Sequence, residues 1–247
     1  MSAVVALDAP TLTRAALAAI SHGTSSATGQ RAVTRLVDAV ARQLPGKTVE
    51  AGFVDVQQPD VPATLGALAA DQPAVIVPLL LSAGYHVHVD LVNEAAGSGR
   101  ITAISRALGP DDRLVDLLVW RLREAGLSPM DTVVLAAAGS SDIRAVEDCR
   151  EMGRRLSLRL DRDVRVGFIS AATPPLPQAV SDARASHPSG RVVVSTYLLA
   201  PGYFFDLACR SGADIVTSPL LTADGPVPNE LVDTVCERYA EHAGERS

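Results

Sequence analysis

Apolar runs alternate with amphipathic segments along most of the chain. Residues 15–20 are apolar throughout, and in residues 30–43 valine and leucine recur at helical spacing. A strand that is apolar on both faces is typical of a buried parallel sheet, and the helical spacing predicts a helix that packs on it. The same reasoning predicts strands at 49–56, from 75 onward and at 101–104, and helices at 61–70 and 114–124. The alternation predicts an α/β fold with doubly wound parallel sheets.

The stretch 75–91, VIVPLLLSAGYHVHVDL, combines an apolar run with ionisable residues. In parallel sheets, ligands bind beyond the carboxyl ends of the strands. We expect the segment after Gly84 to be extended, so that His86 and His88, two residues apart, point to the same side. Asp90 continues that face, and the alternative for Asp90 is a helix N-cap or a first-turn carboxylate.

Segments of the first half recur in the same order in the second half, at offsets between 115 and 118 residues. The matched segments are 19–25 with 135–141, 51–62 with 166–177, 75–88 with 193–206, and 114–118 with 231–235. Four matches at nearly one offset indicate two tandem α/β domains related by internal duplication. We expect a leader at 1–13, an N-terminal domain at 14–127 and a C-terminal, degenerate repeat at 128–247.

The second half keeps the fold signals and loses the histidines. In it, Ala138 replaces His22, Phe204 replaces His86, Asp206 replaces His88 and Ser170 replaces Asp55. This difference suggests that the first half carries the reacting residues and that the second half has a structural role.

Composition excludes several classes of function. The net charge is −6, so the chain lacks the excess of basic residues that indicates nucleic-acid binding. The three cysteines form no CxxC pair, and no apolar run is long enough for a membrane span, so we expect a cytoplasmic protein without nucleic-acid or membrane partners. There is no phosphate-binding loop, no dinucleotide glycine pattern and no GxSxG elbow.

His22 and His86 follow predicted strands of the same half, so we expect them on neighbouring loops that face one cleft, with Asp55 in reach. Imidazole is the usual general base near neutral pH and the commonest metal ligand. The alternative is that these are ordinary polar residues at strand ends. We expect His187 and His242 to be surface residues.

The sequence also resembles a known family. SHGT at 21–24, FVDVQQPDVP at 53–62 and VPLLLSAGYHVHVDL at 77–91 resemble the class II chelatases, which insert a divalent metal into sirohydrochlorin. The likeness is greatest to the two-domain bacterial sirohydrochlorin chelatases, whose second half is degenerate.

The resemblance implies roles for individual residues. It implies His22 and His86 as catalytic residues; His22, His86, Asp55 and His88 as metal ligands; and Gly23, Thr24, Ser25, Gly84 and Tyr85 as substrate-binding residues. The family often has a Glu where Asp55 stands, and Asp reaches about one methylene less far. Arg31, Arg106 and Arg113 are further candidates for the substrate carboxylates.

The activity that the resemblance implies is insertion of Fe²⁺ into sirohydrochlorin to give sirohaem, with the metal as substrate and no tightly bound cofactor. Cobalt insertion into sirohydrochlorin for cobalamin synthesis is the alternative, because imidazole accepts both ions. Two other classes stay open: a non-catalytic carrier of tetrapyrrole or metal, and a small-molecule hydrolase that uses His22. The sequence leaves the oligomeric state open.

Overall fold

The computed structural model describes residues 12, 14–82 and 84–244, and the side chains of residues 85–88 lie outside the described part. The expected leader, 1–13, therefore falls almost entirely outside it. The elements in chain order are β1 (Ala16–Ser21), α1 (Ala27–Gln43), β2 (Val49–Phe53), α2 (Val61–Ala67), β3 (Ala74–Pro78), α3 (Tyr85–Gly97), β4 (Thr102–Ile104), α4 (Asp112–Glu124), β5 (Thr132–Ala137), α5 (Ile143–Leu160), β6 (Val164–Phe168), α6 (Leu176–Ser186), β7 (Val192–Tyr197), α7 (Tyr203–Cys209), β8 (Ile215–Val216) and α8 (Asn229–Ala243).

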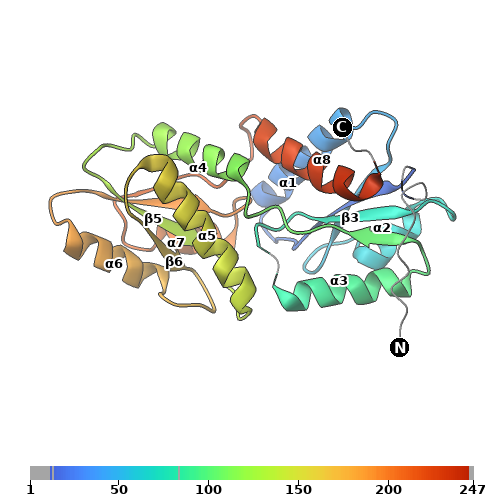
Figure 1. The fold of residues 1–247 in the computed structure, drawn as a ribbon, viewed down its shortest axis with the longest axis horizontal. Helices are drawn as coiled ribbons and strands as arrows, with labels where there is room; N and C mark the ends of the chain where they lie inside the picture. The colour runs from blue at the N-terminus through green and yellow to red at the C-terminus, as the bar shows by residue number, and fades with distance from the viewer. Residues whose placement is uncertain (1–11, 13, 83, 245–247) are drawn as a thin grey trace.

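The strands form two parallel sheets of the same design. The first lobe is built on the order β2-β1-β3-β4 and the second lobe on β6-β5-β7-β8. Figure 1 shows the two lobes side by side along the long axis of the molecule. The predicted fold class, two duplicated doubly wound α/β units, is confirmed.

The central strands are buried on both faces because helices cover both. Every residue of β1 and β7 is buried. In β1, Leu17 and Ala19 face a core shared with α1, whereas Ala16, Ala18 and Ile20 face a second core with α2 and α3. This double burial explains why the strands appear in the sequence as unbroken apolar runs.

The last helix of each repeat covers the other lobe. Helix α4 ends the first repeat but packs on α5 and β7 of the second lobe, and α8 ends the second repeat but packs on α1 and β3 of the first (Figure 1). One apolar cluster therefore runs through both lobes, from Leu36 and Tyr239 to Val193 and Leu117. The boundary between residues 127 and 128 stays a prediction about where the first repeat ends. The packing of α4 and α8 interlocks the two lobes across that boundary.

The expectation that the segment after Gly84 is extended is wrong. Helix α3 begins at Tyr85, and its Leu91 and Ala95, four residues apart, are buried against the sheet. The alternation in His-x-His imitates the two-residue period of a strand, but burial at helical spacing decides the structure. Residues two apart on a helix lie on different sides, so the reason for expecting one shared face no longer holds.

Smaller differences concern element ends. Helix α1 begins at Ala27, three residues before its predicted start, because the Ser26 hydroxyl accepts a hydrogen bond from the Gly29 N–H at 3.3 Å and caps it. Strand β2 and helix α2 end earlier than expected, at Phe53 and Ala67. Within the described residues, no helix has both the length and the apolar run needed to cross a bilayer.

Candidate functional site

A cleft of about 730 Å³ lies between the lobes, at the carboxyl ends of the central strands of both sheets. The loops after β1 and β3 line it from the first lobe, with residues 21–25, 79–82 and 84. The loops after β5 and β7 line it from the second lobe, with residues 138–141 and 197–205. The duplication therefore brings four matched loops to one cleft, at the edge where parallel α/β sheets bind ligands.

His22 follows β1 directly, is exposed and lines the cleft. Its carbonyl accepts a hydrogen bond from the Asp55 N–H at 3.1 Å, which extends the pairing of the first two strands into the loops. Gly23 comes next with φ at +93°, and a Cβ there would collide with the Asp55 carbonyl oxygen. Only glycine permits this turn, which leaves the His22 imidazole at the mouth of the sheet.

Two glutamines hold the loop that carries His22. The Gln57 side-chain oxygen accepts a hydrogen bond from the Thr24 N–H at 2.8 Å, and the Gln30 side-chain amide donates to the Thr24 carbonyl at 2.8 Å. Both backbone groups of Thr24 are thereby satisfied by side chains. Sequence reasoning missed this clamp, although Gln57 stands in the polar turn that follows β2.

Asp55 lies beside His22 through the backbone, but its carboxylate does not line the cleft. The side chain is exposed and accepts a hydrogen bond from the Val56 N–H at 2.7 Å. Val56 and Gln57, the next two residues, line the cleft instead.

The second histidine candidate lies at the start of α3. Gly84 is the N-cap of α3 and lines the cleft, and Tyr85, His86 and His88 follow in the first turn, with side chains outside the described part. Asp90 is exposed in the second turn and does not line the cleft, so it is neither the N-cap nor a first-turn carboxylate.

No group of three or more His, Cys, Asp or Glu side chains that could hold a metal occurs in the part of the chain that the structure describes. Among the described cleft residues, the potential metal donors beside His22 are few. The Cys149 thiol lies 3.7 Å from the Ser82 hydroxyl, and burial raises the pKa of this thiol, which favours the protonated form.

The second-lobe wall of the cleft is aromatic and was not foreseen from the sequence. Tyr197 stands at the position of Leu79 and is buried, and its hydroxyl donates to the Leu81 carbonyl at 3.0 Å, across the lobes. Burial raises the pKa of Tyr197 well above its usual range, so the hydroxyl stays a donor. Tyr203 and Phe204 follow on α7.

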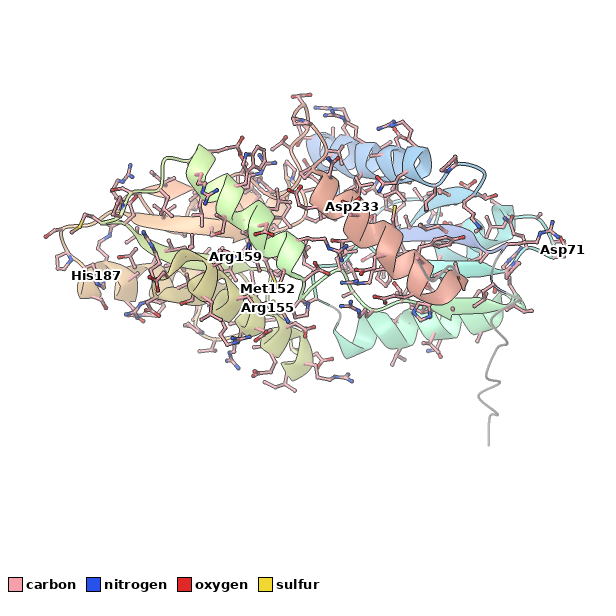
Figure 2. The ribbon with its side chains drawn as sticks, turned by 45° about the horizontal axis from the view of Figure 1, so that its top comes forward. Asp71, Met152, Arg155, Arg159, His187 and Asp233 are labelled. Carbon is pink, nitrogen blue, oxygen red and sulfur yellow. The ribbon has the colours of Figure 1, made fainter. Side chains whose placement is uncertain are left out.

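Charged side chains are absent from the described lining of the cleft. The three candidate arginines lie elsewhere: Arg31 is exposed outside the cleft, Arg106 contacts Glu241 at 3.2 Å, and Arg113 contacts Asp111 at 2.8 Å. His187, at the end of α6, is exposed, and Figure 2 shows it at the outer end of the second lobe.

A model of the CbiX family matches the chain twice, over residues 16–125 and again over 132–241. The chain belongs to the CbiX family. The two matches follow the two repeats, and the resemblance to class II chelatases is confirmed.

Relatives of this CbiX-family chain carry two different names. A sirohydrochlorin cobaltochelatase of Sulfolobus acidocaldarius is 29% identical over 111 residues, which make up 43% of this chain and 88% of that protein. A sirohydrochlorin ferrochelatase of Priestia megaterium is 26% identical over 194 residues, 74% of this chain and 72% of that protein. The first relative is thus about as long as one repeat.

Solved structures share the whole two-lobed fold. SirB from Bacillus subtilis with Fe³⁺ has a TM-score of 0.78 at 20% identity, over 94% of this chain and 98% of that one. SirB from Bacillus subtilis subspecies spizizenii in complex with cobalt has a TM-score of 0.74 at 16% identity, over 93% and 95%.

Proposed function

We propose that this chain inserts a divalent metal into sirohydrochlorin, with Fe²⁺ as the metal and sirohaem as the product. The observation that carries the proposal is the cleft itself: an opening of about 730 Å³ between the lobes, with an exposed imidazole, His22, on its wall. Its volume lies within the range of small-molecule sites. The relatives named sirohydrochlorin ferrochelatase and cobaltochelatase support this substrate.

The reaction needs little from the protein beyond what the cleft supplies. The metal-free ring gives up the protons of two pyrrole N–H groups and takes up M²⁺, so charge balances without electron transfer. A neutral imidazole binds a cation and accepts a proton. We assign both tasks to His22 and His86. His88, in the same turn as His86, and Asp55 are the further metal ligands of the proposal, and Asp55 must turn its carboxylate from the Val56 N–H toward the cleft to bind the metal.

The substrate carboxylates lie on the edge of the ring, and the uncharged cleft suits its faces. The N-termini of α1 and α3 converge on the cleft, since Ser25 and Gly84 at these helix starts line it, whereas the N-terminus of α5 is already capped by the Asp142 carboxylate. Helix N-termini favour anions. In the proposal, the backbone N–H groups at these helix starts bind carboxylates of sirohydrochlorin, because the candidate arginines lie outside the cleft.

Cobalt insertion is the second candidate, and the cobaltochelatase among the relatives favours it. An anaerobic optical assay tests both: protein and metal-free sirohydrochlorin are mixed with Fe²⁺ or with Co²⁺, against protein-free controls. We expect catalysed loss of the metal-free spectrum with both ions, faster with Fe²⁺. A faster rate with Co²⁺ would reverse the assignment of the metal.

Binding of sirohydrochlorin without acceleration would contradict the chelatase and identify a carrier. Hydrolytic activity that persists in the presence of a chelator would instead identify a hydrolase. Both outcomes would remove the proposed reaction while leaving the fold and family unchanged.

A further inference from the structure

Aromatic side chains are few in this chain and gather on one wall of the cleft. The sequence holds four Phe, four Tyr and one Trp. Four of them line the cleft, all from the second lobe: Tyr197, Tyr203, Phe204 and Phe205. The first-lobe residues described in the cleft include no aromatic side chain. Among the described residues, the aromatic side chains of the cleft therefore all come from the second lobe.

Two of these rings are open to solvent. Tyr203 is 70% exposed and Phe204 is 39% exposed, and their ring centroids lie 6.1 Å apart with planes tilted by 36°. Tyr197 differs, because it is fully buried and bonded to the first lobe. Adjacent exposed aromatic rings in a concave, uncharged site mark a surface that a ligand covers.

The repeat shows that Phe204 and Phe205 are particular to the second half, whereas Tyr203 has a tyrosine, Tyr85, at the matched position of the first half. Phe204 stands at the position of His86, and Phe205 at the position of Val87. One half thus has an imidazole where the other has an apolar ring. Since both halves share one fold, packing of the fold alone does not require the phenyl ring at Phe204.

The wall lies beside the loop that carries His22. A side chain at Gly202, the N-cap of α7, would approach the Thr24 hydroxyl to 3.2 Å, and one at Gly29 would collide with the Pro201 carbonyl. The start of α7 therefore packs closely on the start of α1. The rings at the start of α7 and His22 therefore line neighbouring parts of the same cleft.

We propose that Tyr203 and Phe204 form an aromatic platform on which the second lobe stacks the face of a tetrapyrrole ring. The proposal deepens the proposed function and rests on it. A conjugated macrocycle presents two flat apolar faces and keeps its carboxylates at the edge, which matches an uncharged aromatic wall. The first lobe then supplies the metal and proton chemistry, and the second lobe supplies ring binding.

The test measures binding of metal-free sirohydrochlorin by absorbance titration, without metal, to the wild type and to variants of Phe204. Stacking on one aromatic side chain is worth enough that Phe204→Ala should raise Kd about tenfold. Phe204→Trp should keep wild-type affinity, and Phe204→Leu, which keeps apolar volume without a π face, should fall between. Met130→Ala is the control, because Met130 is 72% exposed and precedes β5, at the end of the sheet opposite the cleft.

A second readout separates ring binding from metal binding. Calorimetric titration with Co²⁺ alone should give the same affinity for wild type and Phe204→Ala, because a phenyl ring offers no metal donor. In the insertion assay, KM for sirohydrochlorin should rise while kcat changes by less than about twofold.

The outcomes distinguish the two proposals. If the wild type binds sirohydrochlorin and inserts metal, and both Phe204→Ala and Tyr203→Ala/Phe204→Ala bind it as the wild type does, the platform is overturned and the function stands. If the wild type does not bind sirohydrochlorin, both are overturned. Thermal unfolding of each variant identifies a loss that comes from misfolding, and Phe204→Leu then decides.

Discussion

The two lobes share a fold and differ at the cleft. Strand order, helix placement and the tight glycine turn are the same, since Gly23 and Gly139 both have positive φ and both abut a backbone carbonyl of the neighbouring loop. The first lobe places His22 on its loop, whereas the second places Ala138 there and contributes aromatic side chains to the cleft wall. Duplication thus keeps two copies of the scaffold and lets each wall of one cleft take a different task.

The exchange of α4 and α8 explains how the lobes can diverge without separating. Arg121 on α4 donates to the Leu220 carbonyl of the second lobe at 2.9 Å, and Arg238, at the matched position of α8, donates to the Leu108 carbonyl of the first at 2.9 Å. Each repeat fastens its last helix to the other lobe with a buried arginine. Figure 2, which is turned by 45° from Figure 1, shows Arg155 and Arg159 of α5 beside α4, where they contact Asp112 and Asp116.

The largest expected effect is on turnover. His22→Ala and His86→Ala should each lower metal insertion by about 10²- to 10⁴-fold, because general acid–base groups contribute that much. His187→Ala should be silent. Moving the histidine across the cleft, in His22→Ala/Ala138→His, should not restore activity. The second lobe has Phe204 at the position of His86 and Ala172 at the position of Gln57, so it offers neither the second imidazole nor the clamp. Restored turnover in the initial-rate assay would show that the lobes are interchangeable.

The matched arginines should differ in what they contribute to stability. Arg238 is fully buried and bonds to the Ala107 and Leu108 carbonyls and, at 2.8 Å, to the Asp111 carboxylate. The carboxylate that pairs with Arg121, that of Glu124 at 2.8 Å, is exposed, and no described residue accepts a hydrogen bond from the Arg121 Nε. Arg238→Met should lower the free energy of unfolding by about 3 kcal/mol.

Arg121→Met should lower it by about 1 kcal/mol, the value of an ordinary hydrogen bond. Urea denaturation of the wild type and both variants measures the difference. Equal losses would mean that the two helix contacts are energetically the same, against the asymmetry of their bonds.

A pH dependence should separate the two helix starts. Asp111 caps α4, and the matched cap of α8 is Pro228. Burial alone would raise the pKa of Asp111, but hydrogen bonds from Arg113 and Arg238 hold it well below its usual range. A carboxylate with a lowered folded pKa contributes stability above its unfolded pKa of about 4 and loses it as the pH falls further.

Asp111→Asn should therefore lower the free energy of unfolding by about 2 kcal/mol at pH 7. The difference from wild type should shrink as the pH falls below about 4. Urea denaturation at a series of pH values measures this. A difference that stays constant down to pH 3 would contradict the assigned role of the ionised carboxylate.

The sequence predicts those parts of the fold whose burial leaves a recognisable pattern of apolar residues. Parallel strands covered on both faces leave apolar runs, and the duplicated turns recur at one offset, so the sheets and the repeat follow from the pattern. The exchange of α4 and α8 could not be predicted, because an amphipathic helix has the same pattern whichever lobe it covers. The helix at His86 was missed because His-x-His imitates a strand.

For the candidate site, the sequence placed His22 and its turn at the cleft and missed the opposite wall. Imidazoles and carboxylates stand out in the sequence because they carry chemistry, whereas Phe204 stands out there only as the residue that replaces His86. Their importance comes from lying in the cleft, and only the fold brings the second-lobe loops there.

The smallest expected effect concerns the clamp on Thr24. Gln57 and Gln30 hold both backbone groups of Thr24, and the matched residues of the second lobe are Ala172 and Val146, so the clamp exists only where the histidine does. Gln57→Ala should leave Thr24 N–H without this acceptor and let the His22 loop move, which lowers kcat about three- to tenfold.

Gln57 acts through His22 and does not touch substrate in this account, so it is a positioning residue. Gln57→Glu keeps the acceptor for the Thr24 N–H and should recover most of kcat, whereas a role confined to stability would lower Tm in Gln57→Ala without changing kcat at 25 °C. Gln178→Ala is the control, since Gln178 on α6 is exposed and contacts only Asp182 among the hydrogen bonds described. Equal kcat in all four proteins would show that the clamp does not position His22 for turnover, and this difference between the two lobes would then have no part in the reaction.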